Sequence, residues 1–164
     1  MRYFILPVLL LLILGCQQEK PSAEPSRFQP FTYENSEFIG PKSGQVYLPP
    51  SYFTDTLRQY PVLYMMDQQN LFFDSLAYGG AAWQIHRTTD SLSTAGLMPE
   101  VIIVGVNHAS EKRFQEYLPE KPTARFDSLL EARVGGTAFS DAYLKFLTRE
   151  LKPYVDRTYH AKPG

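Results

Sequence analysis

Residues 61–106 run from PVLYMMD (61–67) to VIIVGV (101–106), and this segment decides the fold. Its two apolar runs are continuous rather than alternating, which is typical of strands covered on both faces. Between them, small or apolar residues recur every three or four positions over 81–95, and Gly96 follows as an expected C-cap. The segment therefore predicts a strand, an amphipathic helix and a second strand, with the strands parallel and the crossover right-handed. The predicted fold class is α/β.

The flanking sequence adds elements on both sides of this unit. Two short strands are predicted over 31–38 and 44–48, the second ended by a pair of prolines. After the unit, 107–136 is polar and irregular, and its length favours a functional surface loop. Apolar residues then share one face of a helix predicted over 138–156, which Pro153 is expected to kink or shorten.

The composition is that of a globular protein and excludes several kinds of function. Of the 164 residues, 44% are hydrophobic and 20% are charged, and this size and balance fit one domain. The formal net charge is −1 and no cluster of Lys and Arg occurs, so no nucleic-acid partner is expected. The single cysteine excludes an internal disulfide.

The three histidines, His86, His108 and His160, match no spacing of metal ligands. His86 falls in the predicted helix, and His160 lies near the end of the chain. His108 follows the second apolar strand, at the edge of the sheet where α/β proteins bind ligands. We expect it to be a polar surface residue and not a catalytic one. Neither a metal nor another cofactor is expected.

The N-terminus has the pattern of an export signal. An apolar run over 3–14 follows the first two residues, and its 12 residues are too few to span a bilayer as a helix. The run ends in ILGC (13–16), which resembles the lipobox of bacterial lipoproteins. That resemblance implies a signal peptide over 1–15 and a lipidated Cys16 as the first residue of the mature chain. An ordinary signal peptide with an incidental cysteine is the alternative.

The residues that follow the cysteine are predicted to be a flexible tether over 16–30. They are rich in polar residues and proline, and they offer little that could be buried. The globular domain is then expected over 31–164. Because two or more acyl chains give durable anchoring, we expect a protein of the cell envelope, held to a bacterial membrane on its periplasmic or outer-membrane face.

Several short motifs follow one another between 44 and 160. They are VYLPPSY (46–52), YPVLYMMD (60–67) followed by Gln69 and Asn70, VGVN (104–107) followed by Arg113 and EYLP (116–119), the glycine pair 135–136, and ELKPYVD (150–156) followed by Tyr159. In this order they resemble the putative-esterase family of α/β-hydrolases, which includes enterochelin esterase, S-formylglutathione hydrolase, feruloyl esterases and mycolyltransferases. The resemblance implies a mixed, mostly parallel sheet with flanking helices, and it covers the N-terminal half of that fold.

The resemblance also implies ester cleavage by a serine, an acid and a histidine, with the serine in a Gly-x-Ser-x-Gly elbow. No serine of this chain has glycines at both −2 and +2. By the resemblance, the elbow would follow 159–164, and the acid and the histidine would come later. We therefore expect an N-terminal fragment of an ester hydrolase, truncated before the nucleophile elbow and inactive as given. The alternative is a non-catalytic lipoprotein that binds a glycan or a protein.

The loop after the first apolar strand carries the expected site. In α/β-hydrolases a backbone N–H of this loop stabilises the oxyanion, and by the resemblance Gln69 would donate it. The family pattern is Asp-Gly-Gln, whereas this chain has Asp67-Gln68-Gln69. A glycine there serves a positive φ or a close approach, so a positive φ at Gln68 would be strained. The alternative is that the three residues only cap a turn and a short helix.

Three side chains near this loop are expected to bind the ester: Gln68, Asn70 and Trp83. By the resemblance, Asn70 lines the mouth of the site, and Trp83 lies near the acyl or alcohol pocket. The alternatives are an exposed helix N-terminal residue for Asn70 and core packing against the strand at 62–66 for Trp83. Glu116 and Tyr117 resemble a motif on the long loop over the site; they could also lie on the surface.

Overall fold

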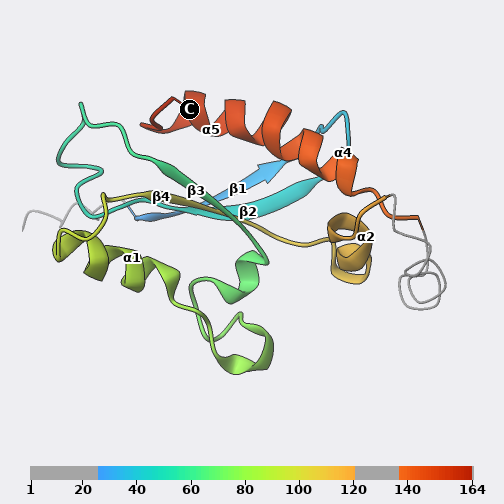
Figure 1. The fold of residues 1–164 in the computed structure, drawn as a ribbon, viewed down its shortest axis with the longest axis horizontal. Helices are drawn as coiled ribbons and strands as arrows, with labels where there is room; N and C mark the ends of the chain where they lie inside the picture. Colours follow the sequence, from blue (N-terminus) through green and yellow to red (C-terminus); the bar gives the residue numbers. More distant parts are fainter. Residues whose placement is uncertain (1–25, 121–136, 164) are drawn as a thin grey trace, which may run out of the picture.

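In a computed structural model, which describes residues 26–120 and 137–163, one four-stranded sheet lies between two layers of helix (Figure 1). Helices α4 (Ser140–Lys145) and α5 (Lys152–Thr158) cover one face, and α1 (Ile85–Thr94) covers the other. The strands are β1 (Phe28–Tyr33), β2 (Lys42–Tyr47), β3 (Val62–Met66) and β4 (Ile102–Val106). The predicted α/β class is confirmed.

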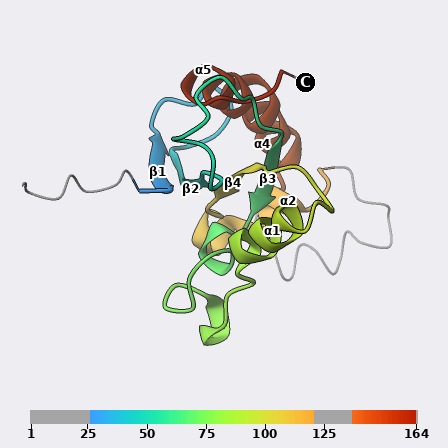
Figure 2. The same ribbon diagram turned by 90° about the vertical axis from the view of Figure 1, so that its left-hand side faces the viewer.

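The strands have the order β1-β2-β4-β3 across the sheet (Figure 2). The predicted parallel pair is confirmed, with Val62 opposite Ile102 and Met66 opposite Val106. The other two pairings, β1 with β2 and β2 with β4, are antiparallel. The described sheet is therefore mixed, as expected, but it is not mostly parallel. A short connection joins β1 to β2, and such connections form antiparallel hairpins, whereas parallel pairs need a crossover.

Strand β4 contributes side chains to two separate cores, which explains its continuous apolar sequence. Ile102, Val104 and Val106 face the helices α4 and α5, in a core that includes Tyr143 and Phe146. The alternate residues Val101 and Ile103 pack on the α1 side, together with Leu71, Phe72 and Tyr47. All five residues of β4 are buried, as the sequence predicts for a central strand.

Two glycines allow the elements to approach β4 closely. A Cβ at Gly44 in β2 would collide with the carbonyl oxygen of Gly105 in β4 and with the ring of Phe31. A Cβ at Gly105 would lie 2.8 Å from Leu71 Cδ1 and 2.9 Å from Gln68 Cγ. Both positions therefore need glycine, because any side chain would push a neighbouring strand or loop away.

The long C-terminal helix continues past Pro153, so of the two expected effects, a kink or a shortening, the shortening is wrong. Between α4 and α5 the chain forms a π-helical segment, η4 (Phe146–Leu151), and Pro153 stands in the first turn of α5. Proline has no N–H and its ring crowds the carbonyl four residues before it. The wider π turn before Pro153 accommodates this, and the helix runs on to Thr158.

The first strand begins three residues earlier than expected, so 28–30 belong to the sheet and not to a tether. Phe28 explains this, because its ring packs against Tyr47, Phe72 and His86. Pro30 is tolerated because β1 is an edge strand. The strand also ends at Tyr33 instead of 38.

Other boundaries differ by a few residues, and some predictions fall outside the description. Helix α1 begins at Ile85 and not at 81, because Gln84 before it has a left-handed conformation, with φ 49°. The C-cap residue is Ala95, and the predicted Gly96 follows it with φ 70°, so the helix ends at the expected glycine. The region expected to be irregular contains two short helices, η3 (Ser110–Lys112) and α2 (Arg113–Tyr117). The signal peptide (1–15), Cys16, most of the tether and 121–136 lie outside the described residues.

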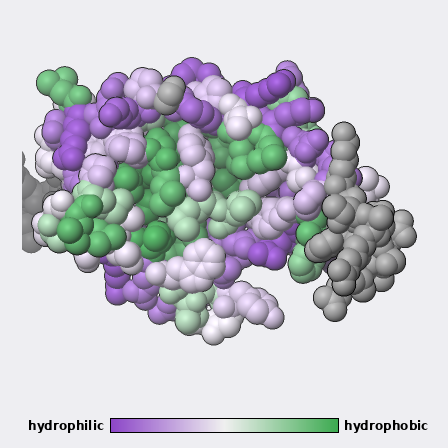
Figure 3. Space-filling model, in the orientation of Figure 1, coloured by the Kyte–Doolittle hydropathy of each residue, from purple (hydrophilic) through white to green (hydrophobic). Residues whose placement is uncertain are grey.

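Strand β3 forms the open edge of the described sheet. Within the described residues its outer side has no strand partner; next to its start, Tyr60 and Ala161 form a parallel bridge. Leu63 and Met66 are 39% and 48% exposed, and apolar side chains gather across this face in Figure 3. No helix in the part that the structure describes is both long and apolar enough to cross a membrane.

Replacing Gly44 by alanine should destabilise the protein by on the order of 1–3 kcal/mol, because the added methyl group collides with Gly105 and Phe31. Gly40→Ala is the matched control, since nothing lies within 4 Å of a Cβ at that position. In urea unfolding, the midpoint should fall for Gly44→Ala and stay near the wild-type value for Gly40→Ala. Equal midpoints in all three proteins would contradict the close approach of β2 and β4.

Candidate active site

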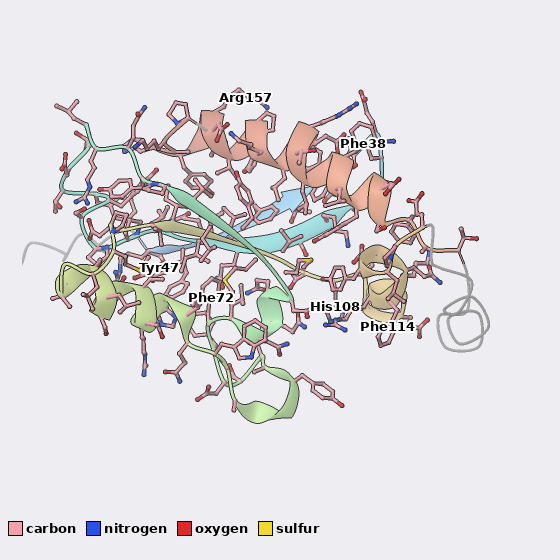
Figure 4. All side chains as sticks on the ribbon, viewed as in Figure 1. Phe38, Tyr47, Phe72, His108, Phe114 and Arg157 are labelled. Carbon is pink, nitrogen blue, oxygen red and sulfur yellow. The ribbon has the colours of Figure 1, made fainter. Side chains whose placement is uncertain are left out.

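The carboxyl ends of the parallel strands β3 and β4 meet at one edge of the sheet, where ligand sites form in α/β folds. After β3 the chain forms the short helix η1 (Gln68–Asn70). After β4 it passes through His108 into η3 and α2, which lie close to η1 in Figure 4. The two loops that could carry chemistry are therefore neighbours.

Asp67, directly before η1, is held by two side chains of α2. Arg113 donates to both carboxylate oxygens, with Nε–Oδ1 at 2.9 Å and Nη2–Oδ2 at 2.6 Å. The Tyr117 hydroxyl donates to Oδ1 at 3.2 Å. The hydrogen bonds from Arg113 lower the pKa of Asp67 below its ordinary value, so the carboxylate is ionised at neutral pH. Fork-to-fork pairs of this kind also fix orientation.

The positive φ of this loop lies at Asp67, with φ 57° and ψ 50°, and not at Gln68, where it would be strained. Among non-glycine residues, Asp is one of the few that tolerate the left-handed region. Such a conformation costs on the order of 1–3 kcal/mol and persists only where the surroundings hold it. Arg113 and Tyr117 supply that constraint, and Gln68 is spared the strain.

Within the described residues, the first turn of η1 leaves two backbone amides without a hydrogen-bond acceptor. Asn70 N donates to Asp67 O at 2.8 Å, and Leu71 N donates to Gln68 O at 3.0 Å. In the described part of the chain, no acceptor faces the N–H of Gln68 or of Gln69. Asp67 stands at the N-cap position but makes no side-chain cap, so simple capping does not describe this loop. The role expected for the Gln69 N–H as an oxyanion donor stays a prediction.

The side chains of Gln68 and Asn70 hold the structure around η1. Gln68 is 7% exposed, and its Nε2 lies 3.3 Å from Gln45 Oε1. Asn70 Oδ1 accepts from the backbone N of Tyr78 at 2.9 Å, and Asn70 O accepts from the backbone N of Trp83 at 2.8 Å. Asn70 therefore closes the loop that leads to α1, through the turn η2 (Tyr78–Gly80). A role for these two side chains in ester binding stays a prediction.

Trp83 does not pack in the core, so that alternative is wrong. Its side chain is 58% exposed, and Tyr78 in the same loop is 92% exposed. The loop carries large aromatic surfaces that face solvent while its backbone is tied to Asn70. A role for Trp83 in substrate binding stays a prediction.

Glu116 and Tyr117 are buried or half-buried parts of the site and not surface residues. Glu116 is 1% exposed and forms an ion pair with Lys42, which is 5% exposed. Its other oxygen accepts from the backbone N of Ala109 at 2.9 Å, beside His108. Burial raises the pKa of Tyr117, so its hydroxyl keeps the proton that it donates to Asp67. Sequence patterns did not point to Lys42, because its partner lies 74 residues away.

The histidines lie apart and do not form a site together. His86 is on α1, where burial lowers its pKa. His160 stacks on Tyr52, with ring centroids 4.8 Å apart. His108 is half-buried rather than fully exposed, and its Nδ1 has no hydrogen-bond partner among the described residues. Nor does the described chain bring three or more His, Cys, Asp or Glu side chains together as metal ligands.

A cavity of about 530 Å³ opens between β3, α2 and α4. Apolar side chains such as Met66, Leu144 and Leu147 line most of it, with Glu116 and Asp141 among the polar ones. The expected site residues, Gln68, Gln69, Asn70 and Trp83, do not line this cavity. It lies along the open edge of the sheet, and Glu116 and Tyr117 of α2 belong to its lining.

Comparison with known proteins identifies the family. The model of the Putative esterase family matches residues 37–164. The chain belongs to this family. Among curated proteins, the uncharacterized protein YbbA of Bacillus subtilis (strain 168) is 27% identical over 115 residues, which are 70% of this chain and 39% of YbbA.

Solved structures of esterases and hydrolases share the fold. A ferulic acid esterase matches with a TM-score of 0.55 and 18% identity, over 82% of this chain and 45% of its own. An IroE-like serine hydrolase from Shewanella oneidensis matches with a TM-score of 0.56 and 22% identity, over 82% and 39% of the two chains. The BES protein from Bacillus cereus matches with a TM-score of 0.56 and 18% identity, over 87% and 50%.

These likenesses confirm the α/β-hydrolase fold that the motifs imply. The chain spans half or less of each similar protein, from 39% of YbbA to 50% of the BES protein. The described sheet and helices therefore correspond to part of the fold of these structures.

Replacing Glu116 by glutamine should lower the free energy of unfolding by about 3–5 kcal/mol, because it leaves the Lys42 ammonium buried without a counter-charge. Asp156→Asn is the matched control: it breaks the exposed Lys152–Asp156 pair, 2.6 Å apart, and should cost less than about 1 kcal/mol. Urea unfolding at neutral pH measures both values. A Glu116→Gln protein as stable as wild type would contradict a buried ion pair.

Proposed function

We propose that this chain is the N-terminal part of an exported, lipid-anchored hydrolase of carboxylic esters. Membership of the Putative esterase family and the likeness to ester hydrolases support the class of reaction. The observation that carries the proposal is the Gln69 N–H, which has no acceptor in the described chain and lies at the carboxyl edge of β3. Edges of this kind are where such folds build their active sites.

The chemistry assigned to this edge is stabilisation of the oxyanion. When a nucleophile attacks an ester carbonyl, negative charge develops on the carbonyl oxygen. An N–H donor fixed in advance lowers the energy of that transition state, and removing one such donor typically costs a factor of about 10²–10³ in rate. In this proposal Gln69 donates from its backbone, and Trp83 offers an exposed surface beside the same loop.

The serine, the acid and the histidine of the reaction have no assigned position in these 164 residues. No serine of the chain has the Gly-x-Ser-x-Gly setting of a nucleophile elbow. The proposed activity therefore belongs to a longer protein that includes this part. The exposed rings of Tyr78 and Trp83 would equally suit the alternative, a lipoprotein that binds a glycan or a protein without catalysis.

The purified 164-residue chain should not hydrolyse a p-nitrophenyl acyl ester above a heat-denatured control, because it lacks the nucleophile elbow. The measurement is release of p-nitrophenolate against substrate concentration. Clear, saturable turnover would contradict the predicted inactivity.

Anchoring is proposed through Cys16, which ends the lipobox-like ILGC (13–16). Expressed in a bacterium fed radiolabelled palmitate, the wild-type protein should incorporate label and partition into the detergent phase of Triton X-114. Cys16→Ala should abolish both, because no thiol is left to acylate. Unlabelled wild-type protein in the aqueous phase would favour the ordinary signal peptide.

A further inference from the structure

At the N-terminus of η1, two groups could accept a hydrogen bond from the Gln69 N–H: the Asp67 carboxylate and the oxyanion of an ester. An Asp at the N-cap normally accepts a hydrogen bond from the N–H of the second or third residue of the helix. For Asp67 these residues are Gln69 and Asn70, and Asn70 N already donates to Asp67 O at 2.8 Å. The Asp67 carboxylate is therefore the natural competitor for the Gln69 N–H, the group proposed to stabilise the oxyanion.

In the structure, the Asp67 carboxylate faces Arg113 and Tyr117 of α2 and does not accept from the Gln69 N–H. Arg113 donates to both of its oxygens, at 2.9 and 2.6 Å, and Tyr117 adds a third hydrogen bond at 3.2 Å. The left-handed backbone of Asp67 accompanies this orientation, and η1 has no side-chain cap. The other titratable group whose charge acts on the carboxylate is His108.

We propose that Arg113 and Tyr117 are positioning residues of the esterase site, which hold the Asp67 carboxylate away from η1 and so keep the Gln69 N–H free for an ester. This inference rests on the proposed function, because it deepens the role of the same loop. Neither side chain needs to touch the substrate. Their effect passes through Asp67, which explains why a charged pair stands beside a backbone donor.

Other contacts fix Arg113 and helix α2 in place. Arg113 packs over the rings of Phe114 and Tyr117, at 5.8 and 5.2 Å from the ring centres. Glu116, also in α2, holds the preceding loop at Ala109 and pairs with buried Lys42 in β2. The orientation of Asp67 is thus tied to the central sheet through α2.

A proton–nitrogen NMR titration of the 164-residue chain tests the inference without any turnover. In the wild type, the amide proton of Gln69 should not shift as the Asp67 carboxyl ionises, because the carboxylate faces Arg113. In Arg113→Gln the released carboxylate should cap η1, and the Gln69 amide proton should move downfield with the ionisation of Asp67. A Gln69 amide that follows Asp67 already in the wild type would overturn the proposal, and so would one that ignores Asp67 in Arg113→Gln.

Two further variants separate positioning from general damage. Adding Asp67→Gly to Arg113→Gln removes the competing carboxylate and tolerates a positive φ, so the Gln69 signal should return to wild-type behaviour. Tyr117→Phe removes one hydrogen bond and should shift the Gln69 amide in the same direction by less; it also serves as the test if Arg113→Gln does not fold. Well-dispersed amide signals from β4 report folding in each sample.

The NMR experiment tests the positioning role, and the ester assay tests the proposed function, so either claim can be contradicted without the other. A longer protein of this family that contains the present chain and shows no ester hydrolysis would remove the proposed function, while the NMR result would still show which group caps η1. Conversely, a Gln69 amide capped by Asp67 in the wild type would remove the positioning role and leave the family's chemistry untouched.

Discussion

Strand β4 is buried on both faces and bonded along both edges, and the other elements depend on this constraint. Ile102, Val104 and Val106 contribute to the core under α4 and α5, and Ile103 contributes to the core over α1. Because β3 pairs with it in parallel, the carboxyl ends of both strands meet at one edge. The loops that leave this edge, η1 and the segment to α2, are neighbours for that reason, although Asp67 and Arg113 are 46 residues apart.

The close packing of loops on β4 and the pairing of charged side chains then determine the structure at the carboxyl edge of β3 and β4. Gly105 admits Gln68 and Leu71 against the sheet, since a Cβ there would lie within 2.9 Å of both side chains. Lys42 and Glu116 bring an ion pair into the interior, which is tolerated because each charge has a partner. The same helix, α2, presents Arg113 to Asp67. Backbone geometry around η1 is thus set by side chains from β2, β4 and α2 together.

Local patterns predicted the elements whose apolar runs are continuous, although β3 is not covered on both faces as expected. The apolar runs at 62–66 and 101–106 became β3 and β4 with their parallel pairing, and Gly96 ends its helix as expected. Local patterns did not predict the boundaries of elements that depend on contacts or backbone geometry outside the pattern. The ring of Phe28 draws 28–30 into the sheet, and a π turn carries the last helix past Pro153. In the candidate site, the motif located the loop at 67–70, but only the structure showed that Asp67 has the positive φ.

By itself, the sequence determined the α/β class, the parallel pair of strands, the family resemblance and the absence of a nucleophile elbow in these 164 residues, because each of these is a property of neighbouring residues. Only the tertiary structure decided which side chains pair and which are exposed. The Asp67–Arg113 and Lys42–Glu116 pairs, the buried Gln68 and the exposed Trp83 all depend on strand register and helix placement. A hydrophobic pattern states that a residue is buried, but which partner it meets depends on how distant segments close over one another.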